Sequence, residues 1–467
     1  MNAPGVRWTP EQVLSLAPDA ASQKAGNKLA TAGPWSGAGN DGEGAVWGLC
    51  KGSGKKPYQT VVDTTGPAYS CSCPSRKFPC KHALGLLLLW AGDEHAVSGG
   101  TVPDWAGQWL DGRRKRAEQQ RERNAGNAGS TENTEAEAAG SGRAADTDAA
   151  RRRAERRAER ITAGATELEQ RLADLLRGGL ASADHSGYGL WEETAARMVD
   201  AQAPGLAARV RELGAIPGSG PGWHVRLLEE CALIHLLDAA WLGRDALPEP
   251  LAATVRTRVG ISSPAVGPAV RDRWRVLAQY DSSDGKVTTR RVWVHGAESG
   301  RTALLLSFGA AGRSPGLALP VGGELAGELA FYAGAGQLRA ELRDEHRITG
   351  EPAAPPPGGP VTAALADYGR ALAEDPWLET WPVTLTEVVP APVPSGDGTA
   401  DGWQLADATG DAAIPLAPAA LSRPGLWKLI ALSGGEPVTV FAEFGHAGAL
   451  PLAAWSPAAG AEPIPLV

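Results

Sequence analysis

The sequence predicts a multidomain α+β protein. A chain of 467 residues is too long for one compact hydrophobic core, so several domains are expected. The apolar pattern also changes along the chain, from mixed to helical and then to alternating. Five regions follow from these changes: a small ββα domain (1–110), a charged flexible linker (111–160), a helical domain (161–265), an antiparallel β-rich domain (266–350), and a C-terminal helix with a small β-rich domain (351–467).

The composition is that of an ordinary globular protein with an acidic balance. Apolar residues make up 43% of the chain, and the net charge is -8. This charge argues against a surface that binds nucleic acid throughout, so any such footprint must be local. The first residues lack an apolar segment behind a basic start, and no apolar run reaches the ~18 residues of a membrane span. We therefore expect a cytoplasmic protein with reduced thiols, which the odd count of five cysteines also favours.

The first region combines strand and helix signals. Residues 9–17 begin with Thr-Pro, which is typical of a helix start. Residues 45–52 and 57–66 carry the Val, Trp and Tyr of two strands, and residues 82–92 are apolar enough for a buried helix. Trp105 and Trp109 follow at helical spacing, so they are expected to cap this small core.

The linker is recognised by its composition. Residues 125–150 are rich in Gly, Ser, Thr, Asn and acids and show no apolar periodicity, so we expect disorder there. Basic segments flank it at residues 113–123 and 151–160. Solvated helix faces with Arg–Glu pairs explain these flanks best, and contact with nucleic-acid phosphates is the alternative.

The helical domain shows the 3.6-residue period. Residues 165–180 are expected to place four leucines on one face: Leu168, Leu172, Leu175 and Leu176. Residues 222–243 are apolar nearly all round, as in a core helix. Cys231 and His235 lie four residues apart on it, which suits metal binding. We favour two core-facing side chains instead, because no third ligand is nearby.

Alternation replaces this period after residue 270. Residues 273–281, 288–296 and 302–309 read as antiparallel strands, and Asp-Gly at 284–285 indicates a hairpin. A proline-rich break at 351–360 precedes the C-terminal region.

The strongest chemical signal is a short window with the spacing C-x-C-x6-C-x-H, formed by Cys71, Cys73, Cys80 and His82. Three thiolates and one imidazole complete a tetrahedral Zn²⁺ site without an open position, which is structural rather than catalytic. Residues two apart on a helix point about 200° apart, so Cys80 and His82 must straddle a helix start. Cys50 is expected to be a small buried side chain, with a spare ligand as the alternative.

The window resembles the SWIM zinc finger over roughly residues 45 to 92, and its four metal-binding residues match the four ligand positions. The wider layout of a finger, a charged linker, a helical part and a β-rich part is similar to that of bacterial SWIM zinc finger proteins. The resemblance implies a bound Zn²⁺ and contact with DNA or with a protein. It also implies possible partners, an AAA+ ATPase of the MoxR type or a von Willebrand A-domain protein.

Positive charge is concentrated on this window. From Cys50 to Trp90 six basic residues face one acid, Asp63, and three thiolates with Zn²⁺ reduce the balance to about +4. Phe78 could stack on a base or fill the small core. The candidate contacts for DNA or RNA are Lys55, Lys56, Arg76, Lys77 and Lys81.

No enzyme motif accompanies the finger. The chain has no G-x-x-x-x-G-K-[ST] loop, no G-x-S-x-G elbow and no H-E-x-x-H helix. We therefore expect a non-enzymatic zinc-binding adaptor whose finger contacts nucleic acid, most readily DNA, or a protein. The alternative is a protein-interaction scaffold in an ATPase system, in which zinc only folds the N-terminal domain.

Overall fold

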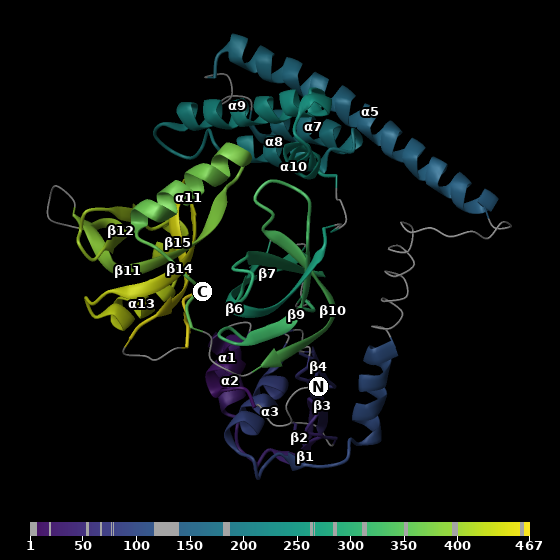
Figure 1. The fold of residues 1–467 in the computed structure, drawn as a ribbon, viewed down its shortest axis with the longest axis vertical. Helices are drawn as coiled ribbons and strands as arrows, with labels where there is room; N and C mark the ends of the chain where they lie inside the picture. Colours follow the sequence, from purple (N-terminus) through teal and green to yellow (C-terminus); the bar gives the residue numbers. More distant parts are fainter. Residues whose placement is uncertain are drawn as a thin grey trace.

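In the computed structural model, the N-terminal domain and the helical region lie at opposite ends, with two β units between them (Figure 1). The residues that the structure describes are 7–17, 20–52, 56–65, 68–75, 77, 79–115, 140–180, 187–261, 265, 267–283, 287–310, 315–349, 354–394, 400–457 and 462–467.

The N-terminal domain is built on a five-stranded sheet with the order β4-β3-β2-β1-β5. Its strands are β1 (Trp35–Asn40), β2 (Ala45–Cys50), β3 (Tyr58–Asp63), β4 (Ala68–Cys71) and β5 (Ser98–Gly99). The expected strand pair corresponds to β2 and β3, which are antiparallel. The ββα prediction was too small, because β1, β4 and β5 extend the sheet on both sides.

Helices cover both faces of this sheet. One face carries α1 (Pro10–Ser15), α2 (Ala20–Asn27) and α3 (Lys81–Gly92), the last of which is buried from His82 to Trp90. A helix over residues 104–115 covers the other face, where Trp47 and Val61 meet Ala106. Trp105 and Trp109 pack against this second cluster, as predicted.

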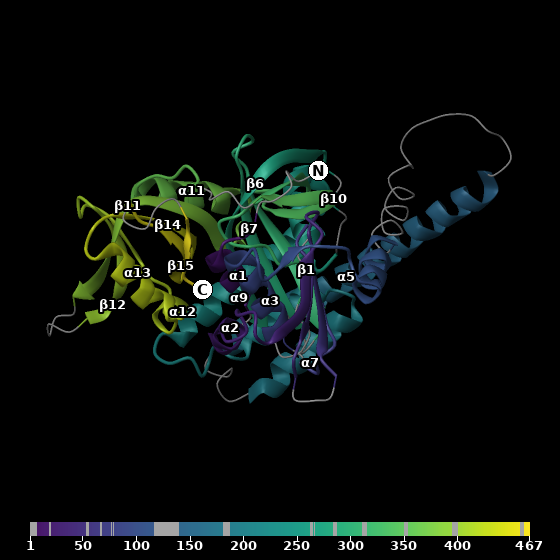
Figure 2. The same cartoon turned by 90° about the horizontal axis from the view of Figure 1, so that it is seen from below.

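The helical region contains α5 (Gly140–Gly178), α7 (Gly187–Asp200), α8 (Pro204–Leu213), α9 (Trp223–Leu242) and α10 (Glu249–Val259). Helix α5 begins inside the expected linker, and its first half extends beyond the other helices (Figures 1 and 2). The remaining linker residues 116–139 lie outside the described residues. Leu168 and Leu172 are buried, but Leu176 is 45% exposed, so the predicted leucine face is narrower than four residues.

The first β unit is a closed barrel with the order β10-β8-β7-β6-β9. Its strands are β6 (Ala269–Ser283), β7 (Val287–Gly296), β8 (Thr302–Ala310), β9 (Glu324–Phe331) and β10 (Arg339–Thr349). Four pairings are antiparallel as expected, but β10 closes on β8 in parallel. This five-stranded connectivity is that of OB-type barrels.

The second β unit is a six-stranded sheet with the order β13-β12-β11-β14-β15-β16. Its strands are β11 (Thr380–Pro394), β12 (Ala400–Asp407), β13 (Ala413–Pro415), β14 (Val438–Gly445), β15 (Gly448–Trp455) and β16 (Ile464–Pro465). Helices α11 (Val361–Glu374), α12 (Pro418–Leu421) and α13 (Gly425–Ser433) accompany it, α11 following the proline-rich break as expected.

Direct contacts join the four regions. One continuous cluster of buried apolar side chains includes Leu84 of the N-terminal domain and Trp274 of the barrel. Trp293 packs with Phe441 between the barrel and the C-terminal sheet. A one-turn 3-10 helix (Arg244–Ala246) leads into α10, whose Arg258 lies 2.7 Å from the Asp375 carboxylate. Within the described residues, no helix is long and apolar enough to cross a membrane.

Candidate metal centre

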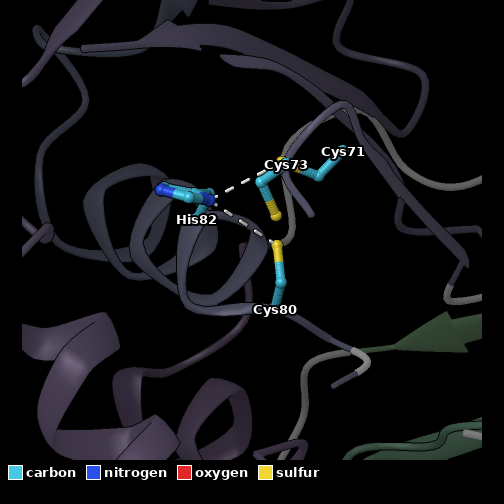
Figure 3. Close-up of side chains that lie close together, drawn as sticks. All are labelled: Cys71, Cys73, Cys80 and His82. Carbon is cyan, nitrogen blue, oxygen red and sulfur yellow. Dashed lines mark hydrogen bonds between the residues drawn. The ribbon is translucent and has the colours of Figure 1, made fainter. Parts of the chain in front are cut away.

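The four predicted ligands meet at the junction of β4 and α3 (Figure 3). Cys71 is the last residue of β4, and Cys73 lies in the turn that follows. Cys80 is the N-cap of α3, and His82 is the second residue of that helix. The predicted position of the pair across a helix start is therefore what the structure shows.

The separations between the ligand atoms suit a tetrahedral ion. All four atoms lie within 4.8 Å of one another. His82 Nδ1 is 3.7 Å from Cys71 Sγ and 4.0 Å from Cys80 Sγ. Bond lengths of ~2.3 Å to sulfur and ~2.0 Å to nitrogen at tetrahedral angles require about 3.6 Å between such atoms. The donor set and its spacing therefore fit a closed metal site, and thiolate-rich sets of this kind favour zinc.

Neighbouring groups hold these ligands in place. The hydroxyl of Thr60, a fully buried residue of β3, lies 3.3 Å from Cys71 Sγ. The ring of Tyr58 packs on the His82 ring with 4.8 Å between centroids. Cys80 is the N-cap residue of α3, and a helix N-terminus favours an anion such as a thiolate. These contacts fix the orientation of the ligands.

The electrostatics concentrate negative charge on one sulfur. A hydrogen bond from the Cys80 thiol, aided by His82 and Thr60, lowers the pKa of Cys71 to about 3. The same bond raises the pKa of Cys80, and burial raises that of Cys73. Metal ligation requires the thiolate form, so binding of a divalent cation would release the protons that the three thiols still hold.

Comparison with protein families agrees with this geometry. The family model of the SWIM zinc finger matches residues 61–91, a range that contains all four ligands. The chain contains a SWIM zinc finger. A second model, the SWIM-associated four-helix bundle domain, matches residues 156–259. Searches of curated proteins and of solved structures each returned no match.

The structure describes three of the five basic residues expected to contact nucleic acid. Lys56, Lys77 and Lys81 are exposed. Lys55 and Arg76, like Phe78, lie outside the described residues. Asp63, the one acid between Cys50 and Trp90, forms an ion pair of 3.0 Å with Arg113. Arg113 thus neutralises the acid within this window, a pairing that the sequence did not reveal because 50 residues separate the partners.

Two further cysteines lie outside the four-ligand group of the SWIM finger. Cys50 is fully buried, and burial followed by the charge of Cys71 raises its pKa. Cys231 is buried on α9, where burial raises its pKa to about 11. The prediction that His235 also faces the core was wrong, because its side chain is 63% exposed and lies 2.7 Å from Glu169. Position 235 falls on the outer side of α9. The apolar pattern could not predict which side of this helix is buried, because the helix is apolar nearly all round.

Proposed function

We propose that this protein is a non-enzymatic, zinc-binding adaptor whose SWIM finger contacts nucleic acid, with DNA as the preferred ligand. The observation that carries the proposal is the exposed basic rim of the metal centre. Lys77 and Lys81, within the segment from Cys71 to His82, and Lys56 of the same domain are exposed in a chain of net charge -8. Asp63, the one acid between Cys50 and Trp90, is paired with Arg113 from outside this window, so the sequence of the window keeps its basic balance.

The metal itself has a structural role in this proposal. Four protein ligands leave a tetrahedral ion no position for water or substrate, so it does not act as a catalyst. Cys71, Cys73, Cys80 and His82 would hold the ion, which would tie the end of β4 to the start of α3. The sequence between Cys73 and Cys80 contains Arg76 and Lys77.

The burial of one barrel face also favours the finger as the nucleic-acid contact. OB-type barrels bind oligonucleotides on the face of their second and third strands. Here those strands are β7 and β8, whose Trp293 and Leu304 pack against Phe441 and Leu452 of the C-terminal sheet. Since the chain covers this face itself, the finger remains the better candidate.

A second candidate function is a protein scaffold, for which an AAA+ ATPase or a von Willebrand A-domain protein would be a partner. One observation favours it. Trp427 on α13 is 65% exposed and makes an edge contact with Trp403, with 6.3 Å between the ring centroids. An exposed Trp427 beside a partly buried Trp403 suits a protein interface.

Salt-dependent binding tests the nucleic-acid proposal. Zinc-loaded protein is titrated with single- and double-stranded DNA and RNA at increasing salt, beside the double variant Arg76→Gln/Lys77→Gln. Each lost phosphate contact should reduce the slope of log K against log salt by about 0.9. The matched control is Lys24→Gln/Lys28→Gln, which removes two exposed lysines of the same domain from α2 and its C-terminal end. Absence of binding at low salt would favour the scaffold.

A further inference from the structure

A second basic surface lies on α5, far from the finger in sequence. Residues 151–160 contain six arginines and two glutamates, a net charge of +4 in ten residues. They lie on α5 where its extended first half (Figures 1 and 2) meets the bundle, which residues 157–160 contact. All are exposed except Arg157 and Ala158, which are partly buried. The charge is therefore presented to solvent on a regular helix.

The arginines gather on one side of this helix. At about 100° per residue, five of them fall within an arc of about 140°. They are Arg152, Arg153, Arg156, Arg157 and Arg160. The two acids, Glu155 and Glu159, fall outside that arc. The buried side chains Ile161, Leu168 and Leu172 lie on a different side of α5, with the centre of the arc about 110° from their mean direction.

Among the residues that the structure describes, few charges face the arginine stripe, the name used here for Arg152, Arg153, Arg156, Arg157 and Arg160. Arg151, outside the arc, lies 3.5 Å from Glu155. Arg157 donates to the backbone oxygen of Gly260 at 3.0 Å, and Arg160 donates to the Gln202 side chain at 2.9 Å, both neutral acceptors. Arg152, Arg153 and Arg156 make no ion pair with any residue that the structure describes.

The chemistry of the stripe selects its partner. A membrane-surface helix needs a free apolar face, but the apolar face of α5 is buried in the bundle. A protein interface needs apolar or aromatic side chains at its centre, and residues 151–160 supply only alanine. Single-stranded nucleic acid is held by aromatic stacking, and this segment has no aromatic residue. A row of guanidinium groups over about 12 Å fits the phosphates of a duplex, which carry one charge per ~1.7 Å of axis.

We propose that Arg152, Arg153, Arg156 and Arg160 form a second nucleic-acid contact, which binds the phosphate backbone of a duplex without reading its sequence. This contact is independent of the finger, since it lies on another domain and needs no metal. Arginine forks bind phosphate oxygens in two-pronged contacts, so the stripe adds affinity and orientation rather than specificity.

The test uses full-length, zinc-loaded protein and a 30-base-pair DNA duplex of arbitrary sequence. The triple variant Arg152→Gln/Arg153→Gln/Arg156→Gln should lower the salt slope by about 2.7 and weaken binding at least tenfold at low salt. All three side chains are exposed, so the fold should be unaffected, which circular dichroism verifies. The matched control is Arg177→Gln/Arg211→Gln/Arg271→Gln, which removes the same charge from arginines that each face an acid.

Several outcomes would overturn the inference. Duplex binding unchanged in the stripe variant would do so, as would an equal loss in the control. Stripe-dependent binding to anionic vesicles or to polyglutamate, with none to the duplex, would assign the surface to a different partner. Comparison with Arg76→Gln/Lys77→Gln separates the two proposals. Loss in the finger variant alone rejects the stripe, and loss in the stripe variant alone rejects the finger.

Discussion

Trp293 of the barrel donates its indole N–H to the Glu443 carboxylate of the C-terminal sheet at 2.6 Å, across 150 residues of sequence. The Tyr280 hydroxyl donates to the same oxygen at 2.7 Å. Glu443 and Trp293 are both buried. One acceptor thus satisfies two donors inside the interface between the two β units, which makes Glu443 the polar link between them.

Glu443→Ala should therefore destabilise this interface. It leaves the two donors without a partner, at an expected cost of about 2–4 kcal/mol. Urea unfolding followed by tryptophan fluorescence would measure the loss, and hydrogen exchange would locate it on β7 and β14. Glu443→Gln keeps an acceptor oxygen and should lose less than half as much. An equal loss in both variants would mean that the hydrogen bonds contribute little.

The pH dependence of the bundle should follow Asp238. This residue of α9 is fully buried, and burial together with repulsion from Glu169 raises its pKa to about 8. The folded state thus holds a proton that the unfolded state releases near pH 4. Stability should fall as the pH rises from about 4 to about 8, by at most about 1.4 kcal/mol per unit, and level off above.

Asp238→Asn should remove this slope and stabilise the bundle at pH 8, because the amide mimics the protonated carboxyl beside Glu169. Hydrogen exchange of α9 at several pH values measures the effect locally. Asp245→Asn alters an exposed acid and serves as the control. A slope that persists in Asp238→Asn would show that another group is responsible.

Thr60→Val should weaken metal binding without removing a ligand. The substitution keeps the shape of a buried side chain but deletes the hydroxyl 3.3 Å from Cys71 Sγ. Loss of such supporting contacts lowers metal affinity about 10-fold or more. Competition with a chromogenic chelator would measure it. Thr64→Val, whose hydroxyl bonds to the Gly44 carbonyl oxygen in the same domain, should retain wild-type affinity.

Cys80→Ser, or removal of the metal by a chelator, should unfold the N-terminal domain, since metal binding and folding are coupled in such sites. Metal analysis should show lost stoichiometry, and hydrogen exchange should rise over residues 45–110. Protection should also fall in β6 and β9, because Trp274 and Leu325 belong to the same buried cluster as Leu84. Cys50→Ala should keep one ion per chain. A Cys80→Ser protein that stays fully loaded and equally stable contradicts the assignment.

The sequence predicted the ligand set because its signal is local. Cys71 to His82 span 12 residues, and the chemistry of thiolates and imidazole limits what such a cluster can do. The contacts that surround the four ligands could not be predicted from the sequence. Thr60 supports Cys71 only because β3 and β4 pair in a particular register, and Arg113 meets Asp63 through the packing of a later helix.

The secondary structure was missed where local preference is weak or misleading. Strand β5 has two exposed residues, Ser98 and Gly99, and exists through its parallel pairing with β1. Helix α5 runs through residues 151–160, where Ala, Arg and Glu favour helix even without an apolar stripe. The parallel closure of β10 on β8 depends on tertiary structure that alternation along one strand cannot express.

The shared core of the N-terminal domain and the barrel has a consequence for synthesis on the ribosome. The finger is complete by about residue 115, but its barrel partner ends at residue 349. At ~5–20 residues per second, the surface that will contact the barrel stays uncovered for roughly 10 to 50 s. During that interval the growing chain exposes apolar side chains that a chaperone can hold. Early capture of zinc would then order the first domain long before its neighbour emerges.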